Sequence, residues 1–177
     1  MASRSRAGSA ACHAAWASTI VSIGRLPLNF IRSGKKSFLA EALESAVELV
    51  QTPASVPPDD LSRLIFACKL IIDYGSELQL DAIATSLRSF QTADEGQYRS
   101  LWQAIDGSEN RRALRLDAIV ITDRRILNRD VRYCDTAAGD ISRLSGHIFY
   151  AESGASVAER DRGTARAITW LKSNELF

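Results

Sequence analysis

Along most of the chain, apolar residues recur at intervals of three and four, the spacing that places them on one face of an α-helix. The segment KSFLAEALESAVELVQ is the clearest case, because its stripe is formed by Leu39, Ala42, Leu43, Ala46, Val47 and Val50. Similar spacing follows in most of the remaining sequence. It predicts helices over residues 37–51, 61–75, 76–90, 96–107 and 156–174.

Residue types at several of these boundaries favour the same helices. Ser-x-x-Gln from Ser76 and Ser-x-x-Glu from Ser156 are capping boxes, in which side chains at the first turn accept backbone N–H groups that lack helical partners. Ser37 is expected to cap the first helix, and Gly75 is expected to end the second in a left-handed conformation. Ser108 is expected to cap a further helix that begins near Arg111.

Short segments with β-branched or aromatic residues are few. AIVIT at 118–122 and HIFYA at 147–151 resemble strands. The sequence therefore predicts a mainly α protein, a compact, helical bundle-like single domain over 37–177 with at most a small β element. A basic N-terminal arm, residues 1–36, precedes it. A chain of 177 residues with 46% hydrophobic content can bury one core without disulfides or metals.

Charge is divided unevenly between the two ends of the chain. Residues 1–40 contain six Lys/Arg and no acid, whereas residues 41–177 contain sixteen Lys/Arg and twenty-one Asp/Glu. Three interpretations of the first segment stay open: an arm that binds nucleic-acid phosphates or an acidic protein partner, an organellar transit peptide, or an Ala-rich first helix. As an arm it would use Arg4, Arg6, Arg25, Arg32, Lys35 and Lys36.

The stretch Arg111–Tyr133 contains seven arginines and three aspartates. As one continuous or kinked helix, it would carry an arginine stripe suited to phosphate, since guanidinium forms bidentate hydrogen bonds and stays charged. Alternatively, a buried strand at Ala118–Thr122 would divide the arginines into two clusters. In either geometry, the aspartates could instead pair with neighbouring arginines on a solvated face that binds no ligand. The predicted phosphate contacts are Arg111, Arg115, Arg125, Arg129 and Arg132.

The sequence contains no complete catalytic or metal-binding signature. Cys12, Cys68 and Cys134 are odd in number and far apart, which favours a reducing compartment such as the cytoplasm or a virion over a disulfide framework. Cys134 and His147 could form a nucleophile and base, but no local motif supports the pair. We therefore expect no enzyme activity, no cofactor and no metal. The longest apolar run, at 64–72, is too short to span a bilayer.

Together these features predict a structural nucleic-acid-binding protein. It would be a small, self-assembling coat-like or nucleocapsid-like subunit (a capsid protein) that contacts the phosphate backbone through arginines, with RNA favoured over DNA as partner. The alternative is a helical protein–protein interaction or assembly module. In that case residues 1–40 would act as a transit peptide to a mitochondrion or plastid.

Overall fold

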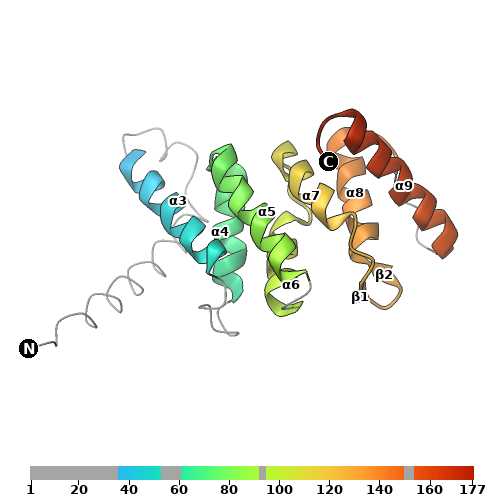
Figure 1. Ribbon diagram of the computed structural model, residues 1–177, viewed down its shortest axis with the longest axis horizontal. Helices are drawn as coiled ribbons and strands as arrows, with labels where there is room; N and C mark the ends of the chain where they lie inside the picture. Colours follow the sequence, from blue (N-terminus) through green and yellow to red (C-terminus); the bar gives the residue numbers. More distant parts are fainter. Residues whose placement is uncertain (1–35, 53–60, 92–94, 150–153) are drawn as a thin grey trace, which may run out of the picture. The chain divides into compact units, whose positions relative to one another are not determined.

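The computed structural model describes residues 36–52, 61–91, 95–149 and 154–177 (Figure 1). These residues form seven α-helices, one 3-10 turn and one two-stranded antiparallel sheet, so the prediction of a mainly α, helical bundle-like fold with a small β element is confirmed. Most of the predicted basic arm lies outside the described residues, including Arg4, Arg6, Arg25, Arg32 and Lys35.

The elements follow one another in the order α3 (Lys36–Gln51), α4 (Leu61–Tyr74), α5 (Glu77–Phe90), α6 (Glu95–Ile105), η3 (Arg111–Ala113), α7 (Leu114–Val120), β1 (Ile126–Asn128), β2 (Val131–Arg132), α8 (Tyr133–Ser145) and α9 (Val157–Ser173). The chain divides into two compact units, residues 1–42 and 43–177. Of the first unit, the structure describes only residues 36–42, which belong to α3. None of the helices in the described segments is long and apolar enough to cross a membrane.

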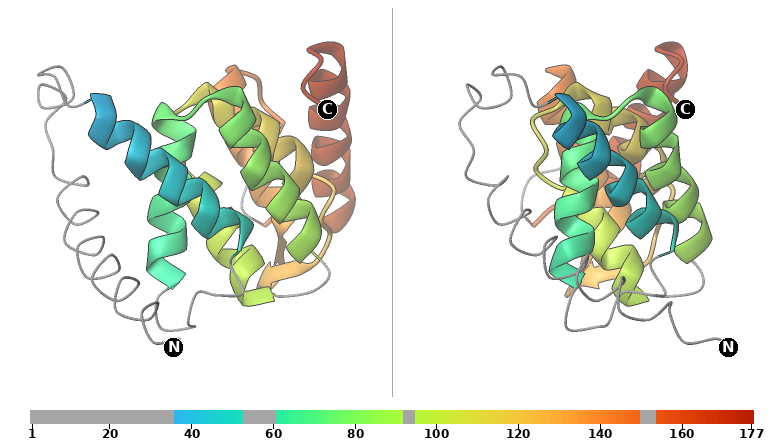
Figure 2. Two further views of the ribbon diagram at one scale, coloured as in Figure 1. Left: turned by 60° about the vertical axis from the view of Figure 1, so that its left-hand side comes forward. Right: turned by 90° about the vertical axis from the view of Figure 1, so that its left-hand side faces the viewer.

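Within residues 43–177, neighbouring helices pack side by side (Figures 1 and 2) and bury one apolar core. Helix α4 packs mainly on α6, α5 packs on both α6 and α7, and α8 packs on α7 and α9. Ser86 of α5 also donates a buried hydrogen bond of 2.7 Å to the carbonyl of Val50 at the end of α3. The largest side chains that are fully buried include Leu64, Ile71, Leu80, Ile83, Leu87, Tyr98, Leu101, Leu116, Ile121 and Tyr133.

Both predicted capping boxes are present. The Ser76 hydroxyl accepts the backbone N–H of Gln79, whose side chain accepts the N–H of Ser76, and Ser156 and Glu159 make the same reciprocal pair. Ser37, in contrast, cannot be the N-cap of α3, because the helix begins at Lys36 and therefore already contains it.

The structural requirement for glycine at position 75 differs from the one predicted. Its φ is not positive, whereas Gly107, Gly146 and Gly154 have φ of 71°, 79° and 91°. A Cβ atom at Gly75 would lie 2.7 Å from the carbonyl oxygen of Ile71. The chain therefore needs glycine at this position because the backbone of α4 approaches closely, and the left-handed C-cap prediction was wrong.

The stretch Arg111–Tyr133 has neither of the two predicted geometries. Ala118–Val120 belong to α7, not to a strand, and the helix ends there instead of continuing. A hairpin follows, in which β1 pairs with β2 and Arg129 occupies the turn with φ 49°. The β-branched residues Ile119 and Val120 are helical because they are buried in the core, and such tertiary contacts outweigh local preference.

Two further local predictions were also wrong. Asn110, not Ser108, caps the 3-10 turn, because the side-chain oxygen of Asn110 accepts the backbone N–H of Arg112 at 3.1 Å. His147–Phe149 form no strand, since they have no neighbouring strand with which to pair; Tyr150 and Ala151 of that prediction lie outside the described residues.

Gly75 and Gly139 should respond in opposite ways to replacement by alanine. A Cβ at Gly139, inside α8, would meet no atom within 4 Å, whereas one at Gly75 would meet the Ile71 carbonyl. Because glycine costs a helix interior about 1 kcal/mol relative to alanine, Gly139→Ala should raise the melting temperature by about 3 °C. Gly75→Ala should lower it. Thermal unfolding followed by circular dichroism measures both, and a stabilising Gly75→Ala would refute the close approach.

Candidate functional site

The five arginines predicted as phosphate contacts in the folded part do not form one stripe. Arg111 opens η3, Arg115 lies on α7, and Arg125, Arg129 and Arg132 belong to the hairpin and its approach. The predicted arginine stripe could form only if the helix continued past residue 120. Because the chain turns there instead, the 100° relation between successive residues no longer applies.

Arg115 is held by carboxylates of α5. Its guanidinium pairs with Glu77 and, at 2.8 Å, with Asp81, while Arg112 donates to Glu77 at 3.1 Å. These side chains are substantially exposed, so the pairs add little stability. They nevertheless neutralise the charges of Arg112 and Arg115 locally. Hydrogen bonds from Arg115 are also the main reason that the pKa of Glu77 lies below its usual range.

Arg125 compensates a buried charge. The Asp123 side chain is 3% exposed, and its carboxylate accepts hydrogen bonds of 2.7 and 3.1 Å from the guanidinium of Arg125. The same guanidinium lies 4.4 Å from the centre of the Tyr98 ring, a cation–π contact. Burial opposes ionisation of Asp123, but the hydrogen bonds from Arg125 outweigh it and hold the pKa of that carboxyl below its usual range.

Arg132 lies at the centre of a network that joins the hairpin, α8 and α9. Its side chain is 11% exposed and pairs with Asp135 and Asp161, both at 2.8 Å. Arg160 adds a 2.9 Å contact to Asp135, and Arg124 a 3.1 Å contact to Asp161. Burial disfavours the charged form of Asp135, yet hydrogen bonds from Arg132 lower its pKa. Arg132 therefore serves the fold.

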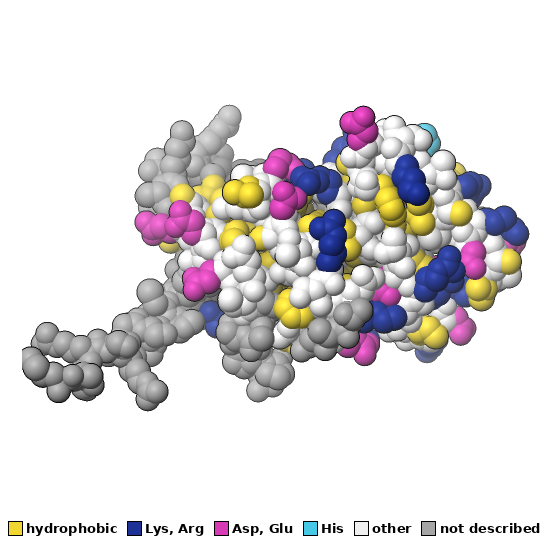
Figure 3. Space-filling model, in the orientation of Figure 1, with side chains coloured by type: hydrophobic (Ala, Val, Ile, Leu, Met, Phe, Trp, Pro, Cys, Tyr) yellow, Lys and Arg dark blue, Asp and Glu magenta, His cyan; other side chains and the backbone are white. Residues whose placement is uncertain are grey.

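Arg111 and Arg129 differ from the other three. Both are exposed, and no carboxylate of the described segments forms an ion pair with either. On the face seen in Figure 3, Lys and Arg side chains lie among Asp, Glu and hydrophobic side chains, not as one continuous basic surface. Of the predicted contacts within the folded part, Arg111 and Arg129 are thus the ones whose guanidinium groups stay open to a ligand.

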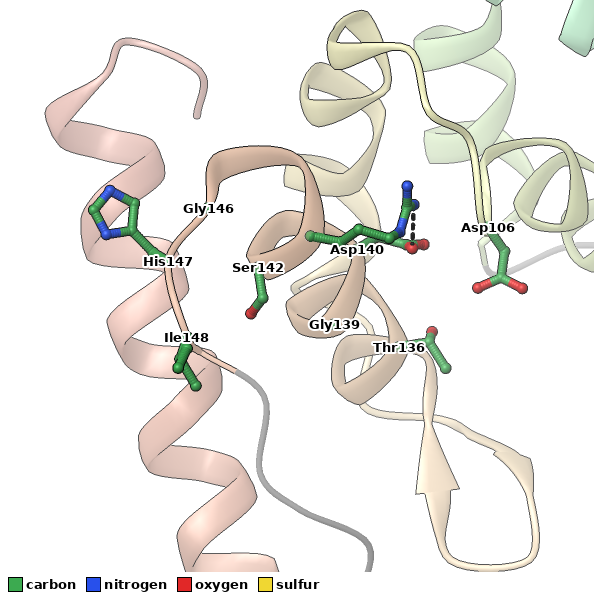
Figure 4. A pocket seen from close by; sticks show the side chains of 9 residues that line it. Asp106, Thr136, Gly139, Asp140, Ser142, Gly146, His147 and Ile148 are labelled. Carbon is green, nitrogen blue, oxygen red and sulfur yellow. Dashed lines mark hydrogen bonds and ion pairs between the residues drawn. The ribbon is translucent and has the colours of Figure 1, made fainter.

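A pocket that the sequence did not reveal lies beside α8. Its volume is about 620 Å³, and it is lined in part by Asp106, Gly139, Asp140, Arg143 and Ile148 (Figure 4). Asp140 extends from α8 on the side of Asp106, pairs with Arg143 at 2.7 Å and accepts the backbone N–H of Gly107. Asp106 and Asp140 are far apart in sequence, and no spacing rule connects them.

A second, smaller hollow of about 300 Å³ shares Asp106 with this pocket. Its lining includes Lys69, Asp73 and Glu109. Burial and the neighbouring Asp140 raise the pKa of Asp106. The two hollows, named here the Asp106 pockets, are thus lined by four carboxylates, those of Asp73, Asp106, Glu109 and Asp140.

Asp117 of α7 is a buried acidic residue. The residue is 2% exposed, and its Oδ2 atom has no hydrogen-bond partner. Burial raises the pKa of Asp117 well above its usual range, and the negative charge of Asp140 adds to the shift. The charges of Arg143 and Asp106 also act on it, the first lowering and the second raising its pKa.

Cys134 and His147 do not form a catalytic pair. The thiol of Cys134 is buried, its pKa is raised by burial and by Asp135, and its sulfur lies 3.9 Å from an Asp135 oxygen. The exposed His147 instead lies near the rings of Phe149 and Trp170, each 5.7 Å away between centres. Within the described residues, no three or more His, Cys, Asp or Glu side chains are grouped to hold a metal ion.

Comparison of the chain with protein-family models, with curated proteins and with solved structures finds no match.

Replacing Asp117 with Asn should stabilise the protein at neutral pH. Because the folded-state pKa of Asp117 is raised, wild type loses stability as pH rises from the unfolded-state value near 4 towards the folded value. Asn carries no charge, so the advantage of Asp117→Asn should be about 2 kcal/mol at neutral pH and shrink in acid. Urea unfolding at both pH values tests this, with the exposed Asp73→Asn as control. A variant less stable than wild type at neutral pH would show that the carboxylate has a stabilising partner.

Arg132→Met should lower the free energy of unfolding by about 2 kcal/mol, since it leaves Asp135 with Arg160 and Asp161 with Arg124 as their remaining ion-pair partners. The matched change Arg111→Met removes an exposed guanidinium without an ion pair and should alter stability by less than about 0.5 kcal/mol. Because the folded-state pKa of Asp135 is lowered, the difference between wild type and Arg132→Met should vanish as pH falls through that pKa. Equal stabilities at neutral pH would contradict the structural role of Arg132.

Proposed function

We propose that the protein is a self-associating structural protein that binds the phosphate backbone of nucleic acid, RNA in preference to DNA, as a coat-like or nucleocapsid-like subunit. The supporting observation is that carboxylates neutralise several arginines of the folded part. Arg115, Arg125 and Arg132 are engaged by carboxylates, so the acid-free segment 1–36 holds the largest supply of cations without acidic neighbours in sequence.

Phosphate binding needs guanidinium groups that are not already satisfied by carboxylates. The proposal therefore assigns phosphate contacts to Arg111 and Arg129 and to the basic residues of the N-terminal segment, namely Arg4, Arg6, Arg25, Arg32, Lys35 and Lys36. Arg115, Arg125 and Arg132 take structural roles. Such contacts are independent of base sequence, and each releases counterions from the nucleic acid.

Self-association is the second part of the proposal. Several large apolar side chains stay exposed, including Leu78 at 81%, Ile148 at 77% and Ile126 at 63%. Contacts between copies would bury some of this surface. The buried thiols of Cys68 and Cys134 form no disulfide in the structure and suit a reducing setting such as the cytoplasm or a virion.

The alternative function, a helical interaction module, gains support from the same ion pairs. If the arginines of the folded part only stabilise it, the domain could act through proteins alone, with residues 1–40 as a transit peptide to a mitochondrion or plastid. Mass spectrometry of the protein from its native source would separate the two proposals. A mature N-terminus between residues 25 and 40 would remove most of the basic segment and favour the module.

Fluorescence anisotropy of a labelled single-stranded RNA, titrated at several salt concentrations, tests nucleic-acid binding. Changing the six basic residues of the N-terminal segment to Gln should weaken binding by more than about tenfold at low salt. It should also reduce the slope of log K against log salt by about 4, as expected for six phosphate contacts on a single strand. Arg111→Gln with Arg129→Gln should reduce the slope by about 1.

Arg88, an exposed residue of α5, provides the matched control, and Arg88→Gln should leave binding unchanged. Circular dichroism confirms that each variant is folded. If the wild-type chain fails to bind RNA even at low salt, the nucleic-acid proposal fails and the interaction module becomes the better one. If all variants bind as wild type does, the contacts lie on other residues.

A further inference from the structure

The Asp106 pockets carry more negative charge than their own cations balance. Arg143 is already paired with Asp140. Asp73, Asp106 and Glu109 form no ion pair with any residue that the structure describes, and Lys69 is the other cation in the lining. Asp106, which both hollows share, is exposed and can be reached from solvent.

The buried carboxyl of Asp117 responds to the same charges. Its Oδ2 atom is enclosed and has no hydrogen-bond partner, and the charged groups that act on it are Asp140, Arg143 and Asp106. Asp106 and Asp140 thus line the larger pocket together with one guanidinium, that of Arg143, and the charge of Asp140 helps to raise the pKa of Asp106 by repulsion. A cation placed at Asp106 would relieve that repulsion.

The shape of the larger pocket suits a long cationic side chain. Gly139 leaves open space beside Asp140, because a Cβ atom there would meet nothing within 4 Å. Ile148 contributes an apolar wall, 77% exposed, against which the methylene stem of a lysine or arginine can pack. Figure 4 shows Asp106 across from Asp140, where the charged end of such a side chain would lie.

We propose that the Asp106 pockets bind Lys or Arg side chains of a basic peptide, and that this peptide is the acid-free segment 1–36 of a second copy of the chain. The inference rests on the self-association in the proposed function and gives it a site. Charge complementarity supports this occupant, because the segment carries six cations and no acid. Two adjoining hollows that share Asp106 can accept two basic side chains of one peptide.

A labelled synthetic peptide of residues 1–36 provides the direct test. The receptor is the full-length chain in which Arg4, Arg6, Arg25, Arg32, Lys35 and Lys36 are changed to Gln, so that its own segment does not compete. Anisotropy at low salt should show binding. Asp106→Asn in this receptor should weaken it by about tenfold or more, as expected for a lost hydrogen bond to a charged group.

Two further variants separate the pocket from general charge. Gly139→Leu fills the larger pocket without removing any carboxylate and should also weaken peptide binding. Glu44→Gln removes an exposed acid of α3 and should leave binding unchanged. The proposal is wrong if the peptide does not bind, or if Asp106→Asn and Glu44→Gln weaken binding equally.

Sedimentation of the otherwise wild-type chain connects the pocket to assembly. Asp106→Asn should shift the chain towards smaller species at low salt, whereas Glu44→Gln should not. RNA anisotropy of the same Asp106→Asn variant keeps the two proposals distinguishable, because its RNA binding should be no weaker than that of wild type. If wild type does not bind RNA but the peptide still binds its receptor, the proposed nucleic-acid function is overturned and the pocket proposal stands.

Discussion

The ion pair between Arg125 and the buried Asp123 is the contact on which much of the fold depends. It forms directly after α7 ends, and the backbone there is fixed by two further hydrogen bonds, from Tyr133 N–H to the Arg125 carbonyl and from Cys134 N–H to the Asp123 carbonyl. The guanidinium also covers the ring of Tyr98, which meets Tyr133 edge to face at 5.1 Å. One charge pair therefore holds together α6, the end of α7, the hairpin and the start of α8.

This arrangement explains why an arginine-rich sequence does not become a basic surface. The turn after α7 takes Arg125 onto the buried Asp123 and brings Arg132 to Asp135 and Asp161, so the positive charge is used to compensate carboxylates of the fold. Arg111 and Arg129 stay open because no carboxylate of the described residues lies near enough to pair with them. The proposed nucleic-acid binding consequently relies mainly on the N-terminal segment.

The opposite imbalance exists around Asp106. There the carboxylates in the lining outnumber the cations. Folded proteins usually pair or hydrogen-bond such groups, and this imbalance is the basis for the proposed basic ligand. The proposed self-association would bring the cations of the N-terminal segment to the acids of this pocket.

The sequence by itself determined most helices, because apolar spacing and capping boxes act within one or two turns. It correctly located the helices around Leu64, Leu80 and Leu101 and the caps at Ser76 and Ser156. It could not place Ala118–Thr122, where burial overrode a β-branched preference, nor could it find the Asp106 pockets. The arginine contacts were equally hidden, since Arg115 meets Asp81 and Arg132 meets Asp161 across separations of 34 and 29 residues. Tertiary structure alone decided those pairings, because a chain reversal that depends on long-range packing sets which charges meet.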